Sequence, residues 1–159
     1  MQVELMDASG HKAAVTNLNQ LYLYDFVEFA DADVNQAGLY TSAYLDAYWF
    51  EEDRHPFLIC VGGRFAGFAL VRRHAEGKHS IAEFFVMRKY RRKGIGERAA
   101  TQVYARFPGR WTVHQMASNP GAQAFWRKTI DRVTGGRFTE TEHAGRSPGT
   151  SQSFDNSAR

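Results

Sequence analysis

The sequence contains little cysteine and no long hydrophobic run, and each shortage excludes a class of protein. Cys60 is the single cysteine among 159 residues, which excludes an internal disulfide and a multi-cysteine metal site. No apolar run reaches the roughly 18 residues that a membrane-spanning helix needs. Residues 1–10 carry Glu4 and Asp7 and lack the apolar segment of a signal peptide. We therefore expect a cytoplasmic protein with no metal site and no membrane partner.

Apolar and aromatic residues are abundant enough for one sizeable core. Hydrophobic residues make up 43% of the chain and aromatic residues 14%, which argues against intrinsic disorder. A length of 159 residues suits one domain. No internal repeat divides the chain. We therefore predict a single domain over residues 1–159, with Cys60 as a small core residue inside the apolar run 57–61.

Positive charge is concentrated in one short segment. The formal net charge is only +3, yet five cations fall within residues 88–93: Arg88, Lys89, Arg91, Arg92 and Lys93. Such a cluster on a nearly neutral protein indicates local anion binding. The alternatives are a solvated turn or a nucleic-acid patch. A nucleic-acid-binding protein usually spreads basic residues over a face and carries more charge overall, so we predict no nucleic-acid partner.

The hydrophobic pattern predicts an α/β domain with the order β-α-α-β-β-β-α-β-α-β-β. The predicted strands are residues 2–5, 56–61, 65–72, 80–87, 111–116, 137–141 and 151–155, and the predicted helices are residues 12–29, 41–50, 95–107 and 120–133. Asn119 and Pro120 suit the cap and the first position of the last helix.

The strand over residues 80–87 is apolar on both faces. Strict alternation places Ala82, Phe84 and Val86 on one side, and Ile81 and Phe85 on the other. A strand of this kind lies in the middle of a sheet that is covered on both sides. Glu83 interrupts the second set, so its carboxylate requires a structural or a chemical reason.

A basic turn with two glycines follows that strand and precedes a helix. Glycine lets backbone N–H groups approach phosphate oxygens closely, and the unpaired N–H groups of a helix start attract negative charge. These features favour a pyrophosphate ligand. The P-loop and the dinucleotide-binding fingerprint do not fit, because Gly94 and Gly96 are the only glycines of the segment and Ala99 occupies the position of the third.

The pattern Arg91-x-x-Gly94-x-Gly96 resembles motif A of the GNAT (GCN5-related) N-acetyltransferase superfamily. A second match follows, since this family continues with a strand, an asparagine and a helix with an aromatic pair, here residues 111–116, Asn119 and Phe125-Trp126. The resemblance covers roughly residues 57–155. It implies a single-domain GNAT fold, with a mixed central sheet splayed at its middle strands and flanked by about four helices.

The resemblance also implies an acetyl-CoA-dependent N-acetyltransferase in which a primary amine attacks the thioester directly. The pantetheine arm would lie between the splayed strands, and the pyrophosphate would rest on the glycine turn. A backbone amide near Val86 would stabilise the oxyanion. The implied cofactor-binding residues are Phe84, Phe85, Val86, Arg91, Arg92, Lys93, Gly94, Ile95, Gly96, Asn119 and Trp126.

Two residues are candidates for the general base that deprotonates the amine. His114 has a suitable ordinary pKa, and some members of the family carry a carboxylate base on its strand. Glu83 lies on the strand that leads to the splay. Each also has a plain structural explanation, as a hydrogen-bonded histidine of the cleft wall and as a carboxylate paired with an arginine.

One departure from the family pattern affects the chemistry. Many members have a tyrosine at the position of Trp126, where its hydroxyl is proposed to protonate the departing thiolate, and an indole cannot act as that acid. The thiolate then leaves unaided or another tyrosine substitutes. This departure keeps open a second hypothesis, a non-catalytic GNAT-like module that binds CoA.

The N-terminal helices would build the acceptor site. Their aromatic and acidic residues are Tyr22, Tyr24, Asp25, Glu28, Asp31 and Asp33. This set would suit a cationic small-molecule or peptide amine, or would simply form an acidic surface. The sequence leaves open the acceptor, the acyl chain and the oligomeric state, with a homodimer among the alternatives.

Overall fold

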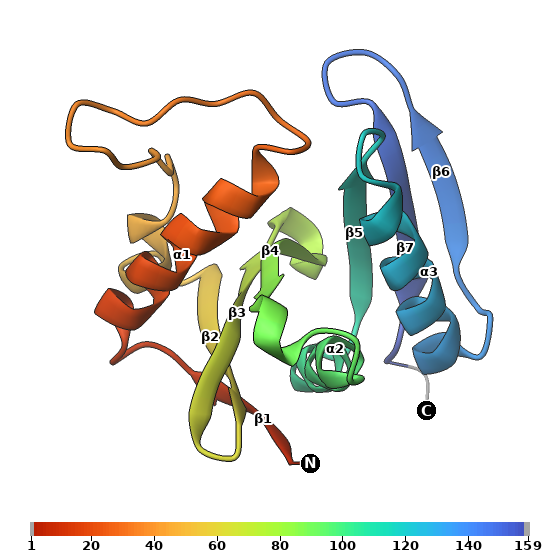
Figure 1. Cartoon of the computed structure of the whole chain (residues 1–159). Coiled ribbons are helices and arrows are strands. Elements are labelled where there is room, and N and C mark those ends of the chain that lie inside the picture. The colour runs from red at the N-terminus through yellow and green to blue at the C-terminus, as the bar shows by residue number, and fades with distance from the viewer. Residues whose placement is uncertain (1, 158–159) are drawn as a thin grey trace.

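Seven strands form one mixed sheet within residues 2–157, the part of the chain that the computed structural model describes (Figure 1). Their order across the sheet is β1-β2-β3-β4-β5-β7-β6. Neighbouring strands are antiparallel except β4 and β5, which are parallel. The strands are β1 (Val3–Asp7), β2 (Arg54–Val61), β3 (Arg64–Arg73), β4 (His79–Val86), β5 (Arg110–Met116), β6 (Thr139–His143) and β7 (Gly149–Asp155).

Helices cover both faces of the sheet. Helix α1 (Lys12–Phe26) packs on one face of β2, β3 and β4, while α2 (Ile95–Arg106) and α3 (Pro120–Thr134) pack on the opposite face. The apolar residues of α1 that reach the sheet include Val15, Leu18 and Tyr22, spaced as one face of a helix requires. Two separate apolar clusters result, one under α1 and one under α2 and α3. Cys60 lies buried in the α1 cluster, as predicted.

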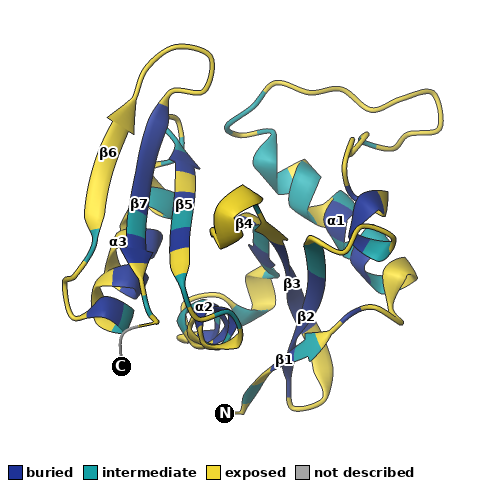
Figure 2. Ribbon diagram, turned by 180° about the vertical axis from the view of Figure 1, so that it is seen from behind, coloured by how far each residue is buried: buried dark blue, intermediate teal, exposed yellow. Residues whose placement is uncertain are grey.

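Burial differs sharply between the last two strands of the sheet. Strand β7 is mostly buried, whereas all five residues of the outer strand β6 are exposed (Figure 2). Asn119 accepts a hydrogen bond from the Ala122 amide at 3.0 Å and so caps α3, which confirms the prediction from Asn119 and Pro120. Among the described residues, no helix has the length and apolarity needed to cross a bilayer.

The predicted helix over residues 41–50 is wrong. The segment contains only a short 3-10 helix, η1 (Asp46–Trp49), so the described residues form three α-helices where about four were expected. Side chains hold this segment in an irregular path. Gln20 of α1 bonds both the amide and the carbonyl of Tyr40, at 2.9 and 2.8 Å, and the Trp49 indole donates to the Ala8 carbonyl at 3.0 Å.

Candidate functional site

The central strands β4 and β5 pair only at their beginnings. The register joins His79 to Trp111 and Ser80 to Thr112, and no pairing follows. Beyond that point β4 continues to pair with β3, and β5 with β7, so the two halves of the sheet diverge toward the carboxyl ends of both strands (Figure 1). We call the unpaired stretch from Ile81 to Val86, facing β5, the strand divergence. Apart from the Val86 carbonyl, which accepts a hydrogen bond from Arg91, its backbone groups that face β5 bond no strand among the described residues.

A β-bulge at Ala82 sets the direction of every side chain at the strand divergence. The β3–β4 register passes from Val71–Ile81 to Leu70–Glu83 and leaves Ala82 unmatched. An extra residue on one strand reverses the alternation beyond it. Ile81 therefore shares the α2 face with Phe84 and Val86, while Phe85 joins the α1 cluster. Strict alternation had placed Ile81 with Phe85, and the bulge corrects that prediction.

The backbone of β4 presents two residues to the strand divergence. The Met87 amide bonds the Ala66 carbonyl of β3 at 2.8 Å, so the backbone groups of Phe85, two residues earlier, also point to β3. Those of Phe84 and Val86 point the other way, toward β5. Phe85 was predicted to contact the cofactor with the other two. Its backbone instead faces β3, and its side chain is buried under α1.

The basic turn after β4 exposes a run of backbone donors. After η3 (Arg88–Tyr90), Arg92 and Gly94 adopt left-handed conformations with φ of 60° and 76°. Among the described residues, no acceptor bonds the N–H groups of residues 92–97, and the first bonded amide is that of Arg98, on the Gly94 carbonyl at 3.1 Å. Successive unpaired amides at a helix start form a concave anion-binding nest.

Gly96 lies against the aromatic pair of α3. A Cβ atom at Gly96 would lie 3.1 and 3.2 Å from two ring carbons of Phe125 and 3.7 Å from the Phe84 ring. Trp126, only 6% exposed, packs on Phe84 and Phe125 with ring centroids 5.0 and 4.8 Å apart. Trp126 is therefore part of the core, and half-buried Phe125 is the ring beside the turn.

Two arginines of the turn bond a carboxylate on α1. Asp25 accepts hydrogen bonds from Arg88 at 2.7 Å and from Arg91 at 2.5 Å, and Arg91 also donates to the Val86 carbonyl at 2.7 Å. Burial tends to raise the pKa of Asp25, but the hydrogen bonds from Arg91 and Arg88 outweigh it and lower the pKa. Arg91 thus fixes the turn to α1, whereas Arg92 and Lys93 form no ion pair within residues 2–157.

Glu83 points to the α1 face and bonds a tyrosine there. The Tyr22 hydroxyl donates a hydrogen bond to its carboxylate, and the Tyr22 ring packs on Phe26, Phe68 and Phe85. Burial raises the pKa of the half-buried Glu83 carboxyl, and the hydrogen bond from Tyr22 opposes part of that rise. A carboxylate with a raised pKa is suited to accept a proton near neutral pH.

His114 lies on the same face as Glu83, but on β5 and at the surface. Its neighbours Trp111 and Val113 face α2 and α3, so its own side chain points to the opposite face, where it is exposed. The imidazole Nδ1 lies 3.0 Å from the Ser151 hydroxyl, and His143 Nε2 lies 2.9 Å from the same hydroxyl. Burial, and then the nearby His143, lower the pKa of His114.

Comparison with known proteins identifies the family. The model of the acetyltransferase (GNAT) family matches residues 17–130, most of the chain. The chain belongs to the GNAT acetyltransferase family. A search of curated protein sequences finds no match.

Solved structures share the GNAT fold at low sequence identity. The aminoglycoside acetyltransferase AAC(6')-Ib in complex with coenzyme A and kanamycin has a TM-score of 0.68 at 17% identity, over 97% of this chain and 95% of that one. Spermidine N-acetyltransferase from Vibrio cholerae with CoA and spermine has a TM-score of 0.68 at 11% identity, over 98% and 96%. An acetyltransferase from Thermus thermophilus has a TM-score of 0.65 at 15% identity, over 98% and 97%.

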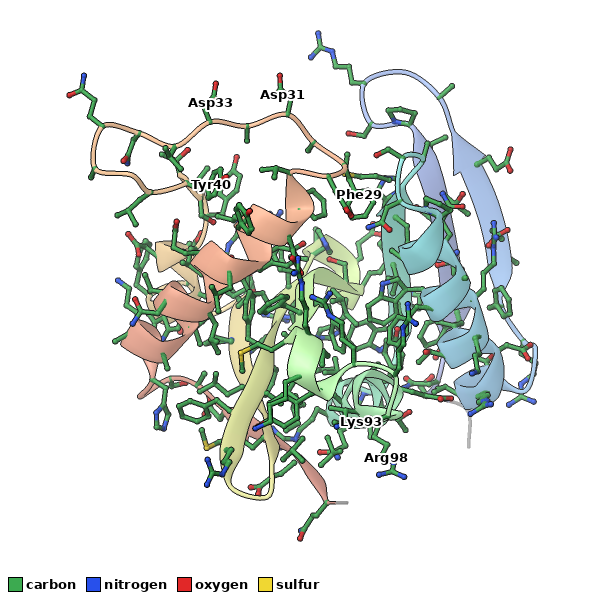
Figure 3. The ribbon with its side chains drawn as sticks, viewed as in Figure 1. Phe29, Asp31, Asp33, Tyr40, Lys93 and Arg98 are labelled. Carbon is green, nitrogen blue, oxygen red and sulfur yellow. The ribbon has the colours of Figure 1, made fainter. Side chains whose placement is uncertain are left out.

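Few of the carboxylates in the N-terminal region of this GNAT domain are both unpaired and directed toward the sheet. Asp31 and Asp33 lie on an exposed loop and point away from the body of the domain (Figure 3). Asp25 is paired with two arginines. The loop end at Phe29 approaches the other half of the sheet, where its carbonyl accepts a hydrogen bond from Ser118 at 3.1 Å. The space between the two halves of the sheet is therefore bordered by α1, this loop end and β5.

Sequence reasoning missed three features of the site. The pairing of Asp25 with Arg91 was not foreseen, because the two residues are 66 positions apart and no local pattern links them. It missed the bulge at Ala82, for which Glu83 was the available signal, since a carboxylate breaks the apolar alternation there. It also emphasised Trp126 over Phe125, although Phe125 is the ring beside Gly96.

Proposed function

We propose that the protein transfers an acetyl group from acetyl-CoA to a primary amine by direct attack on the thioester. The observation that carries this proposal is the run of six unpaired amides, residues 92–97, immediately beside the strand divergence. Such amides suit the pyrophosphate of CoA, and an open strand edge suits the amide-bearing pantetheine arm. Membership of the GNAT family supports both assignments.

Each residue near the turn receives a distinct role in cofactor binding. The backbone groups of Phe84 and the amide of Val86 bond the pantetheine arm, and the amides of residues 92–97 hold the pyrophosphate. Arg92 and Lys93 add positive charge, and Lys93 lies in the turn just before α2 (Figure 3). Arg91 acts indirectly, since it holds the turn against Asp25 and Val86. Asn119 caps α3 at the end of β5.

We assign no direct cofactor contact to Phe85 and Trp126, although both were expected to bind CoA. The backbone of Phe85 faces β3, and Trp126 is enclosed by Phe84 and Phe125. Trp126 supports the turn through these rings. We assign no general acid, because the indole of Trp126 has no acidic proton to give and lies in the core. The departing thiolate then takes its proton from solvent.

Glu83 is the base that the geometry favours over His114. It is half-buried and faces the α1 side, from which the acceptor enters, and burial raises its pKa. The amine nitrogen forms the new C–N bond, the C–S bond breaks to leave the CoA thiolate, and Glu83 takes the amine proton directly or through water. His114 is exposed, and its Nδ1 is engaged with Ser151. It remains the second candidate.

The acceptor class that we propose is a small-molecule or peptide primary amine. Similar folds carry aminoglycoside and spermidine acetyltransferases. The pairing of Asp25 with Arg88 and Arg91 removes one carboxylate from the set that would attract a polycation. An amine panel therefore needs to include monoamines and peptides beside polyamines and aminoglycosides.

Thermal melting with acetyl-CoA tests the cofactor assignment. A ligand at about 100 times its dissociation constant stabilises the folded state by roughly 2.7 kcal/mol. We expect the melting temperature to rise with acetyl-CoA, and an unchanged melting curve at millimolar acetyl-CoA rejects the assignment. The alternative of a non-catalytic CoA-binding module predicts the same stabilisation but no transfer. Release of free thiol in the presence of the amine panel separates the two.

A further inference from the structure

We infer that Tyr22 is a positioning residue, whose hydroxyl holds the Glu83 carboxylate in place for the reaction proposed above. The inference rests on that proposed function, because it gives Tyr22 a role through the general base. Tyr22 was otherwise only one of several aromatic residues near the acceptor region. Its hydrogen bond to Glu83 joins residues 61 positions apart and links α1 to β4.

The Tyr22 ring is itself held firmly. Three phenylalanine rings surround it, with centroids 5.5 Å away for Phe26, 5.7 Å for Phe68 and 5.7 Å for Phe85. These rings come from α1, β3 and β4, so the hydroxyl is fixed relative to the sheet as well as to its own helix. A hydrogen-bond partner that is locked by packing gives a reactive group one orientation.

The protonation state of Tyr22 makes the hydroxyl a permanent donor. Burial, and then the neighbouring Glu83 carboxylate, raise the pKa of Tyr22 well above its ordinary value. The hydroxyl therefore stays protonated throughout the working pH range, and it bonds the ionised form of Glu83 better than the protonated form. Removal of this donor is expected to favour the protonated carboxyl.

A second contact fixes the same helix one turn later. Asp25 lies three residues after Tyr22, so the two side chains share a face of α1. Asp25 bonds Arg88 and Arg91 of the basic turn. Helix α1 is thus attached to β4 through the candidate base and to the turn that follows β4 through two arginines. Helix α1 therefore holds both the candidate base and the proposed phosphate-binding turn in place.

Other charged and titratable groups lie on the same face as Glu83, but its pKa shift comes from burial and from the hydrogen bond of Tyr22. They are Tyr48 of η1, Arg54 of β2 and Arg72 of β3, with His114 of β5 across the strand divergence. Burial raises the pKa of the Tyr48 hydroxyl, and the neighbouring Arg54 opposes that rise. None of these groups bonds the Glu83 carboxylate, so Tyr22 is the one hydrogen-bond donor to that carboxylate among residues 2–157.

The test is the titration of Glu83 in the wild type and in Tyr22→Phe. The variant keeps the ring and loses only the hydroxyl. The Glu83 carboxyl is followed by carbon-detected nuclear magnetic resonance, with its signal assigned from Glu83→Gln. We expect the Glu83 pKa to rise by roughly one unit or more, because a hydrogen bond to a charged group is lost. The acidic limb of the pH profile of kcat/KM should move to higher pH by the same amount, while kcat at a pH well above that limb should change little.

Tyr44→Phe is the control for the loss of a tyrosine hydroxyl. Tyr44 is 67% exposed and belongs to neither proposed site, and its substitution should leave both the titration of Glu83 and the pH profile unchanged. An unchanged Glu83 pKa in Tyr22→Phe overturns the inference, and so does a shifted pKa with an unmoved acidic limb. Failure of the proposed function appears separately, as a wild-type protein that binds acetyl-CoA but acetylates no amine.

Discussion

The close packing of Gly96 on Phe125 makes one substitution especially informative. In Gly96→Val, the new Cβ would lie 3.1 Å from the Phe125 ring, closer than most real Cβ contacts. Overpacking of this kind costs about 1–3 kcal/mol, partly offset because valine has a higher helix propensity than glycine. For a domain of this size, that lowers the melting temperature by roughly 2–12 °C. We also expect the branched side chain at the helix start to hinder the close approach of a phosphate to the amides of residues 92–97.

A double variant separates the two effects. Phe125→Leu gives the Gly96→Val side chain more room, so Gly96→Val/Phe125→Leu should recover melting temperature relative to Gly96→Val. It should still bind acetyl-CoA poorly, because the turn remains obstructed. Differential scanning fluorimetry with an acetyl-CoA titration measures both quantities, with Phe125→Leu alone as the control. Wild-type acetyl-CoA affinity in the double variant would refute the pyrophosphate site on this turn, and unchanged melting of Gly96→Val would refute the packing.

Three further predictions concern the base, a buried hydroxyl and the histidines. Glu83→Gln should lose about 10²–10⁴-fold in kcat with acetyl-CoA affinity intact, whereas His114→Asn should lose little; the reverse order would make His114 the base. Tyr104→Phe should keep or raise the melting temperature, because the buried Tyr104 hydroxyl has no hydrogen-bond partner within the described chain, and a loss of stability beyond about 1 kcal/mol would contradict this. Burial, and then His55, lower the pKa of His79, so the folded state should lose stability as the pH drops below about 6.5. His79→Phe should weaken that pH dependence. The same fall in melting temperature from about pH 7.5 to 5.5 in wild type and variant would contradict this prediction.

The sequence predicted those parts of the fold that depend on local patterns. Apolar alternation and turn glycines located the β2–β3–β4 meander, and Asn119-Pro120 located the start of α3. The helix over residues 41–50 failed because long-range bonds decide that segment. Gln20 holds Tyr40, and Trp49 bonds Ala8, neither of which leaves a periodic signal.

The sequence predicted the phosphate-binding turn of the candidate site better than the contacts of its side chains. The spacing of Arg91, Gly94 and Gly96 indicated a phosphate-binding turn, and the structure has unpaired amides there. The bulge at Ala82 reverses which side chains share a face with Ile81, and the Arg91 side chain bonds Asp25. Both outcomes depend on tertiary contacts between distant segments. A motif fixes the backbone path more reliably than the partners of its charged residues.

Steady-state transfer with the wild-type protein tests the central claim most directly. Acetyl-CoA is incubated with a panel of monoamines, polyamines, aminoglycosides and peptides, and free thiol and acetylated amine are measured in the same reaction. We predict that at least one amine gains one acetyl group for each thiol released, and that Glu83→Gln slows this transfer by about 10²–10⁴-fold. Stabilisation by acetyl-CoA without acetylation of any amine would contradict the claim and favour a non-catalytic CoA-binding module.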